Sequence, residues 1–123
     1  MKKEFKFKLL EAGIGVEFGE EKYLVTYEEA ELSWDDGKKW CEERGGKLPT
    51  IEQLITLYEH SDEINVALEK AGKESVGGWI WSDREHSSNE RLAWCVYMDY
   101  GYTDCYYKDY TFYVRAVSAF HIQ

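Results

Sequence analysis

Residues 79–120 read WIWSDREHSSNERLAWCVYMDYGYTDCYYKDYTFYVRAVSAF, and this stretch determines the fold class. Aromatic residues dominate it, and polar or glycine-containing segments separate its apolar runs, which is the pattern of consecutive strands. The connection Asp99-Tyr100-Gly101 is typical of a tight hairpin loop. The pattern predicts an aromatic β meander with strands at Trp79 to Trp81, Ala93 to Met98 and Tyr113 to Phe120.

The sequence before this stretch begins with two predicted strands. Phe5, Phe7 and Leu9 alternate with lysines, as in a half-buried strand, and Lys22 to Tyr27 form a second run. Lysines on the solvent side of a strand discourage pairing with another chain, so we interpret the basic N-terminus as a protected sheet edge. The N-terminal region is therefore predicted to be β-structure.

Helices are predicted between the two β regions. Their expected N-caps are Ser33, Thr50 and Ser61, and their expected stops are Gly45-Gly46 and Gly72. Apolar residues at helical spacing give each helix one buried face: Trp34, Gly37, Trp40 and Cys41 in the first, Ile51, Leu54, Ile55 and Tyr58 in the second, and Ile64, Leu68 and Ala71 in the third. The fold class is α+β, with two to three helices packed on a twisted antiparallel sheet.

The composition is that of a globular protein and excludes several partners. The length of 123 residues fits a single domain, 1–123, and 44% hydrophobic residues are enough for a packed core. The net charge of -9 argues against nucleic acid, because binding to phosphates requires clustered Lys and Arg. An anionic membrane surface would be repelled for the same reason.

The sequence leaves the compartment open. The opening residues have no apolar run of the length that a secretory signal requires, and no stretch is long enough to span a bilayer. The chain has three cysteines, Cys41, Cys95 and Cys105. Secreted domains stabilised by disulfides usually carry an even number, so this count favours a reducing environment. We expect a cytoplasmic protein, a virion component or a trimmed form of an exported protein, without membrane insertion.

The aromatic residues of the C-terminal third exceed what one small sheet can bury. Twelve of the chain's twenty aromatic residues lie between Trp79 and Phe120. Tyrosine offers a large rigid contact area with a polar tip, so exposed tyrosines favour a binding surface. The alternative is that they form cross-strand pairs that only stabilise the sheet.

Two segments of the chain resemble a known family. Gly46 to Leu54, GKLPTIEQL, is similar to an Arg-Leu-Pro-Thr helix start, and the second segment runs from Trp79-Ile80-Trp81-Ser82 through Ala93-Trp94-Cys95-Val96 and Gly101 to Tyr113–Phe120. These motifs resemble a bacterial and phage family with a C-type-lectin-like fold. The family is found in collagen-like adhesins and is related to variable proteins of diversity-generating retroelements. The resemblance covers roughly Leu32 to Phe120.

The resemblance implies a ligand face between the Trp-x-Val strand and the closing strand. Residues on this face would be Tyr97, Asp99, Tyr100, Tyr102, Asp104, Tyr106, Tyr107, Asp109 and Tyr110. Trp79, Trp81, Trp94, Val96, Val114 and Phe120 would be framework. The resemblance also raises the hypothesis that residues 97–113 are diversified. The Glu-Pro-Asn loop and Trp-Asn-Asp triplet of calcium-dependent lectins are missing, so we expect no calcium-dependent sugar site. Asp99, Asp104 and Asp109 could supply oxygen ligands to a calcium ion, but their spacing matches no standard calcium loop, and the alternative is that they are ordinary surface acids.

Enzymatic alternatives rest on few residues. A three-residue hairpin loop would direct Trp94, Val96 and Met98 into the core, and would place Cys95 opposite Cys105. Opposed cysteines could bind a soft metal, as in the formylglycine-generating oxidases of the same broad fold, or form a bridge. The alternative is two unconnected thiols. His60, His86 and His121 share no metal-ligand spacing.

We therefore predict a non-enzymatic recognition domain that needs no cofactor and binds a protein or a glycan through the tyrosine and aspartate face. The runner-up is a structural or assembly module of a phage or surface complex that uses the same face as a subunit interface. Arg115 lies between apolar residues in a predicted strand, where a charge requires a partner, so we predict a structural salt bridge there.

Overall fold

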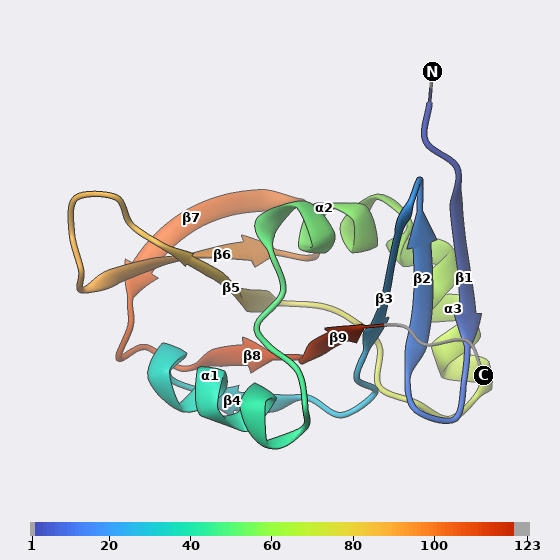
Figure 1. The fold of residues 1–123 in the computed structure, drawn as a ribbon, viewed down its shortest axis with the longest axis horizontal. Helices are drawn as coiled ribbons and strands as arrows, with labels where there is room; N and C mark the ends of the chain where they lie inside the picture. Colours follow the sequence, from blue (N-terminus) through green and yellow to red (C-terminus); the bar gives the residue numbers. More distant parts are fainter. Residues whose placement is uncertain (1, 120–123) are drawn as a thin grey trace.

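The computed structural model describes residues 2–119, which form two sheets and three helices (Figure 1). The first sheet has the antiparallel order β1-β2-β3-β9. Its strands are β1 (Phe5–Leu9), β2 (Ile14–Phe18), β3 (Glu21–Val25) and β9 (Val117–Ala119). The two predicted N-terminal strands are confirmed, and β1 with its exposed lysines is an outer strand. β2 was not predicted, although Ile14 and Val16 alternate there with Gly15 and Glu17.

The second sheet has the order β4-β8-β5-β6-β7. Its strands are β4 (Ala30–Leu32), β5 (Trp79–Glu85), β6 (Leu92–Tyr97), β7 (Tyr102–Tyr107) and β8 (Phe112–Val114). The predicted meander is confirmed for β5, β6 and β7, which pair antiparallel, whereas β8 runs parallel to β5.

The predicted closing strand from Tyr113 to Phe120 is wrong as one strand. The chain leaves the second sheet after Val114 and enters the first sheet at Val117. The change occurs where the Ala116 amide donates to Thr26 Oγ1 at 3.1 Å and the Arg115 side chain turns inward. Phe120 lies outside the described residues. The short connection between β8 and β9 thus carries the chain from the second sheet to the first (Figure 1).

The three predicted helices are confirmed as α1 (Trp34–Glu43), α2 (Ile51–Glu59) and α3 (Ser61–Lys70). Ser33 caps α1 and Thr50 caps α2 in a complete capping box, as predicted. The predicted Ser61 cap is wrong, because α2 and α3 are separated by His60 alone and Ser61 is already helical. Within residues 2–119, no helix is long and apolar enough to cross a membrane.

The core has two clusters, one on each side of the second sheet. α2 contacts β5 and β6 on one side, where Ile80, Val96 and Met98 join Leu54 and Leu57. α1 contacts β5 and β8 on the other side, and that cluster contains Trp34, Cys41, Leu48, Trp81, Ala93, Cys95, Val114 and Ala116. Because both faces of β6 are covered at this position, Cys95 is fully buried.

Arg115 ties the connection between the sheets to the N-terminal half. Its side chain is 1% exposed and pairs with Glu29 at 3.0 Å. The guanidinium also donates to the backbone carbonyls of Thr26, Tyr27, Glu74 and Ser75. The predicted structural salt bridge is confirmed, and the carbonyls supply the further acceptors that a buried guanidinium requires.

The β6–β7 hairpin has a register one residue different from the predicted register. Tyr97 pairs with Tyr102, so the loop contains the four residues Met98–Gly101 and not three. Cys95 therefore faces Asp104, and Cys105 faces Trp94 on the opposite side of the sheet. All three cysteines are free, and the predicted juxtaposition of Cys95 and Cys105 is wrong. Trp94, expected in the core, is only half-buried.

Candidate functional site

A row of aromatic rings crosses the face of the second sheet on which α1 packs. Trp79, Tyr97 and Tyr102 are register partners on β5, β6 and β7, so their side chains project from the same face. Tyr106 pairs with Ala93 on that face as well. Trp79 and Tyr106 rest against the cluster beneath α1, which makes the row an extension of the core.

The rings form one contiguous network, which we call the aromatic array. It consists of Trp79, Tyr97, Tyr100, Tyr102, Tyr106, Tyr110 and Phe112. The Trp79 ring lies 4.9 Å from the Tyr97 ring and 5.2 Å from the Tyr106 ring, measured between centroids. Phe112 lies 5.2 Å from Tyr106 in an edge-on contact. These are the separations and tilts at which aromatic pairs attract one another.

The array has an inner and an outer layer. Its inner rings, Trp79, Tyr97, Tyr106 and Phe112, are half-buried. Its outer rings are exposed: Tyr100 by 65%, Tyr102 by 62% and Tyr110 by 47%. The outer rings pack on the inner layer, with Tyr100 at 5.7 Å from Tyr97 and Tyr110 at 5.8 Å from Tyr106. Exposed rings supported in this way present apolar area with little rotamer entropy left to lose on binding.

Tyr107 stands apart from the other tyrosines of β7. It pairs with Leu92, so it projects from the opposite face of the sheet, and its side chain is 50% exposed. Its ring still reaches Tyr110 at 6.1 Å. Tyr107, Asp109 and Tyr110 border an open hollow of about 860 Å³ together with Ser33, Asp35, Glu90, Arg91 and Lys108.

The three aspartates of the predicted face have different surroundings. Asp99 accepts from the Gly78 amide at 3.2 Å, and Asp104 accepts from the Cys105 amide at 2.8 Å. Asp104 lies between Tyr102 and Tyr106 on the array side of β7, because it pairs with Cys95. Asp109 borders the hollow. All three carboxylates are on exposed residues.

Two tyrosines of the array hold their protons more tightly than usual. The pKa of Tyr97 is raised above 10.0, mainly because its hydroxyl bonds to the Asp99 carboxylate, whose charge also opposes ionisation. The pKa of Tyr106 is raised by desolvation first and by the charge of Asp104 second. Tyr97 and Tyr106 therefore present protonated hydroxyls next to the side chains of Asp99 and Asp104.

The structure brings most of the predicted face together and adds two residues to it. Tyr97, Tyr100, Tyr102, Tyr106 and Tyr110 belong to the array, whereas Tyr107 joins it only through Tyr110. Trp79, predicted as framework, lies at the centre of the array. Phe112 was not singled out, although its spacing of two from Val114 places both on the core face.

Residues 15–118 match the family model of the Lcl C-terminal domain. The chain belongs to this family. The Lcl C-terminal domains are a C-type-lectin-like family of binding domains, and the match includes every strand of the second sheet and the whole array. No match was found among curated proteins.

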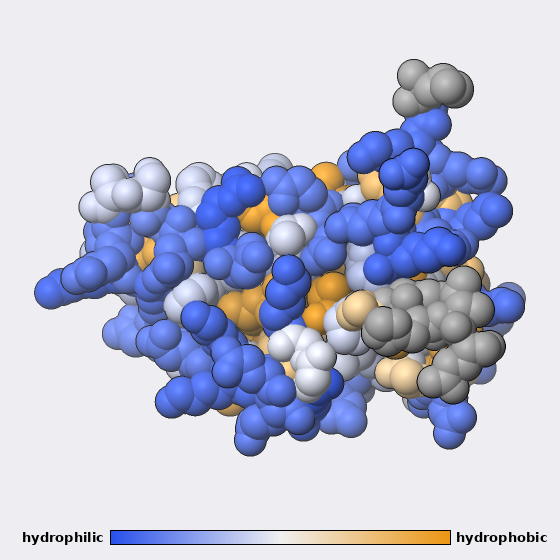
Figure 2. All heavy atoms as spheres, in the orientation of Figure 1, coloured by the Kyte–Doolittle hydropathy of each residue, from blue (hydrophilic) through white to orange (hydrophobic). Residues whose placement is uncertain are grey.

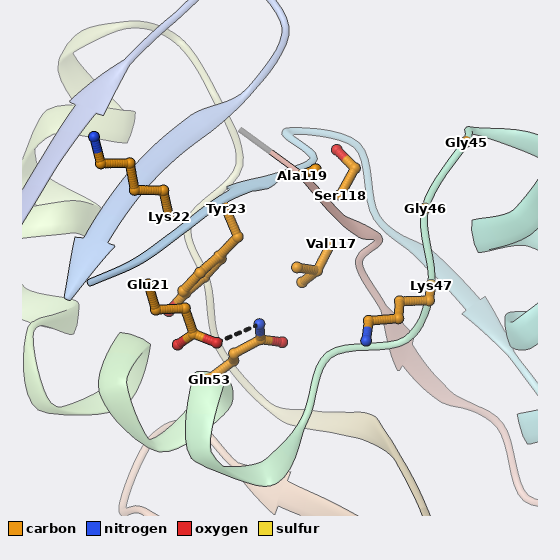
Figure 3. Close-up of a pocket in the computed structure, with 10 residues that line it drawn as sticks. All are labelled: Glu21, Lys22, Tyr23, Gly45, Gly46, Lys47, Gln53, Val117, Ser118 and Ala119. Atoms are coloured by element: carbon orange, nitrogen blue, oxygen red, sulfur yellow. Dashed lines mark hydrogen bonds between the residues drawn. The ribbon is translucent and has the colours of Figure 1, made fainter. Parts of the chain in front are cut away.

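A second concavity of the Lcl C-terminal domain is lined by strands β3 and β9 of the first sheet and by the α1–α2 connection (Figure 3). It has a volume of about 430 Å³, and Tyr23, Val117 and Ala119 contribute to its lining. In Figure 3, Gln53 points toward Glu21, to which its amide donates at 3.3 Å. Orange atoms beside the α1–α2 connection in Figure 2 show apolar surface reaching solvent between the helices on that side. None of the predicted site residues lines this concavity.

Potential ligands for metal ions are dispersed in the described part of the chain. Residues 2–119 contain no group of three or more His, Cys, Asp or Glu side chains arranged to hold a metal ion. His60 bonds to Glu63 at 2.8 Å and stacks on Phe5, and His86 accepts from the Ser88 and Asn89 amides. His121 lies outside the described residues. Local contacts thus account for the two described histidines.

Proposed function

We propose that this chain is a single recognition domain, residues 1–123, that binds a protein or glycan ligand and catalyses no reaction. The proposed contact residues are those of the predicted face, Tyr97, Asp99, Tyr100, Tyr102, Asp104, Tyr106, Tyr107, Asp109 and Tyr110, with Trp79 and Phe112 beneath them. One observation carries the proposal: three tyrosine rings that are about half or more exposed stand on a half-buried aromatic layer. Membership of a family of binding domains supports it.

The burial of two of the three thiols favours binding over catalysis. Cys41 and Cys95 are fully buried. Burial raises the pKa of Cys41 to about 12 and raises that of Cys95 further. Catalytic cysteines require the opposite shift, because the thiolate is the nucleophile. These two cysteines therefore act as small apolar core residues.

The test is a ligand screen with a matched pair of variants. Wild-type protein would be applied to glycan and protein arrays beside Tyr102→Ala/Tyr110→Ala and beside Val66→Ala, which removes an exposed apolar side chain of α3. We expect ligands whose affinity falls about 10-fold or more in the tyrosine variant, since truncating an aromatic contact residue costs on the order of 1–2 kcal/mol. The Val66 variant should bind like wild type, and a chelator should change nothing. Ligands that bind equally well to all three proteins would contradict the proposal.

The second candidate function is that of an assembly module. Exposed aromatic patches also mark subunit interfaces, and the outer rings of the array form such a patch. The molar mass in solution discriminates between the two. A stable oligomer that becomes monomeric in Tyr102→Ala/Tyr110→Ala would favour assembly, whereas a monomeric wild type with a ligand favours recognition.

A further inference from the structure

Two of the four outer strands, β1 and β7, differ in how they are protected. β1 ends the first sheet and carries Lys6 and Lys8, both exposed, on its solvent side. β7 ends the second sheet, along the upper border in Figure 1, and its sequence YTDCYY contains neither lysine nor proline. Protein edges normally carry such residues to prevent strand addition. β7 is thus an edge without lysine or proline, and its only charged side chain is Asp104.

The hydrogen-bond pattern shows which backbone groups of β7 face outward. The Lys108 amide donates to the Arg91 carbonyl at 2.8 Å, which is a bonded pair of the β6–β7 ladder. Bonded pairs alternate in an antiparallel ladder, so residues 104 and 106 bond to β6, while Thr103, Cys105 and Tyr107 direct their N–H and C=O groups away from it. Asp104 satisfies the Cys105 amide and the Tyr110 amide satisfies the Tyr107 carbonyl. The Thr103 groups, the Cys105 carbonyl and the Tyr107 amide remain directed toward an added strand.

The side chains around this edge favour a positively charged occupant. Residues 92–107, which form β6, β7 and their loop, contain two aspartates and no lysine or arginine. The cations that flank this range are Arg91 and Lys108, which lie opposite each other at the end of the hairpin away from Asp99. Lys108 pairs with Glu85 and lies over the Trp34 ring at 4.5 Å. Exposed tyrosine rings with aspartates between them attract ammonium and guanidinium groups through both ring faces and charge.

We propose that β7 accepts an extended segment of a partner protein that carries lysine or arginine at alternate positions. The segment adds to the five-stranded sheet as a further strand and lays its cationic side chains beside Tyr102, Asp104 and Tyr106. A second copy of this chain is the less suitable occupant, because it would bring a further net charge of -9 and the same aspartates. This inference rests on the proposed function and names the class of ligand.

The test begins with a displayed library of random ten-residue peptides, selected on the wild-type protein. We expect enriched peptides with Lys or Arg at every second position. Two synthetic copies of the best peptide would then be made. One would be methylated on the backbone nitrogens of its odd-numbered residues and the other on those of its even-numbered residues. Only one copy should lose binding, by about 10-fold or more, because only every second N–H of an added strand faces β7.

Variants of the protein complete the test. Thr103→Pro removes an outward N–H without touching the β6 ladder, and it should weaken the best peptide about 10-fold or more. Asp104→Asn keeps the acceptor for the Cys105 amide and removes the charge, so it should weaken binding about 3-fold to 10-fold at low salt. Asp62→Asn on α3 removes the same charge elsewhere and should change binding less than about 2-fold.

The outcomes separate this inference from the proposed function. Failure to enrich basic peptides, equal binding of both methylated copies, or full binding by a folded Thr103→Pro variant would overturn strand addition. A glycan or a compact protein that still requires Tyr102 and Tyr110 would then leave the proposed function in place. Peptides that also bind unchanged to Tyr102→Ala/Tyr110→Ala would contradict both.

Discussion

One face of the second sheet has a covered half and an open half, and their sequences look alike. Under α1, Trp81, Cys95 and Val114 are fully buried. Two residues further along the same strands, Trp79 and Tyr97 are half-buried and lead to exposed rings. The strands supply the same alternation of large side chains to both halves. The difference is made by the helix, which packs over β5 and β8 near Val114.

An aromatic side chain of this sheet is buried where a helix covers it and exposed where none does. Its candidate role, in the core or in binding, therefore depends on the element that packs on it. A Trp under a helix contributes its whole surface to stability. A Trp at the margin of the same helix contributes part of its surface to the core and supports rings that face solvent. The margin of α1 therefore marks the boundary between framework and candidate binding face.

The largest effect on stability is expected from replacing Trp81 with alanine, and the contrasting change is the replacement of Trp79. Trp81 is 0% exposed and its indole donates to the Leu32 carbonyl at 3.1 Å, so Trp81→Ala should lower the free energy of unfolding by about 3–5 kcal/mol. Trp79→Ala should cost only about 1–3 kcal/mol but should abolish ligand binding, because the array loses its central ring. Urea denaturation and the ligand screen measure the two quantities. Equal destabilisation by both changes would contradict the division into covered and open halves.

A smaller effect is expected at the contact between α1 and the sheet. A Cβ on Gly37 would lie 2.8 Å from Val114 Cγ2, closer than van der Waals contact allows. Gly37→Ala should therefore destabilise the protein by about 1–3 kcal/mol, despite the higher helix propensity of alanine. Adding Val114→Ala removes the obstructing methyl group, so the double variant should lose less than the sum of the two single changes in a double-mutant cycle.

Elements with strong local signals were predictable from the sequence. The Thr50–Gln53 capping box and the Ser33 cap are local hydrogen bonds, so spacing alone identifies them. The density of tyrosines after Tyr97 similarly predicts the exposed rings, since one sheet cannot bury them all. The sequence also predicted that Arg115 pairs with an acidic side chain, because it stands between apolar residues. It did not indicate which of the many acids, Glu29 in the structure, would be the partner.

Elements set by long-range pairing were not predictable. Residues Val114 and Val117 read as one strand, and only their partners β4 and β3 in separate sheets divide them. The loop of four residues at Met98–Gly101 has the same composition signal as one of three. A change of one residue in the loop length changes which residues pair across the hairpin. The wrong loop length therefore led to the wrong prediction that Cys95 lies opposite Cys105. The role of Trp79 likewise depends on where α1 ends.

A modest effect is expected on the pKa of Tyr97, which lies in the open half of the sheet face. Because the Asp99 carboxylate raises the pKa of Tyr97, Asp99→Asn should lower that pKa toward 10.0. A raised pKa in the folded state means that the contact stabilises the protein below pH 10 and is lost as pH rises through the Tyr97 pKa. Wild-type protein should therefore lose more stability than Asp99→Asn on moving from pH 8 to above the Tyr97 pKa. Unfolding measured at both pH values would show parallel losses if Asp99 had no such role.

The smallest effect is expected from oxidation, and it tests the hairpin register. Cys95 is buried on the α1 side of the sheet, whereas Cys105 is partly exposed on the other side. A mild oxidant should form no Cys95–Cys105 disulfide and leave the melting temperature unchanged, because the sheet separates the two thiols. A thiol reagent at pH 8 should modify Cys105 first, with Cys41 and Cys95 reacting only upon unfolding, since burial raises the pKa of both. Mass spectrometry after digestion resolves the three sites. An intrachain bridge between Cys95 and Cys105 would show that Cys95 pairs with Cys105 as in a three-residue loop, and the boundary drawn along β6 and β7 would then move by one residue.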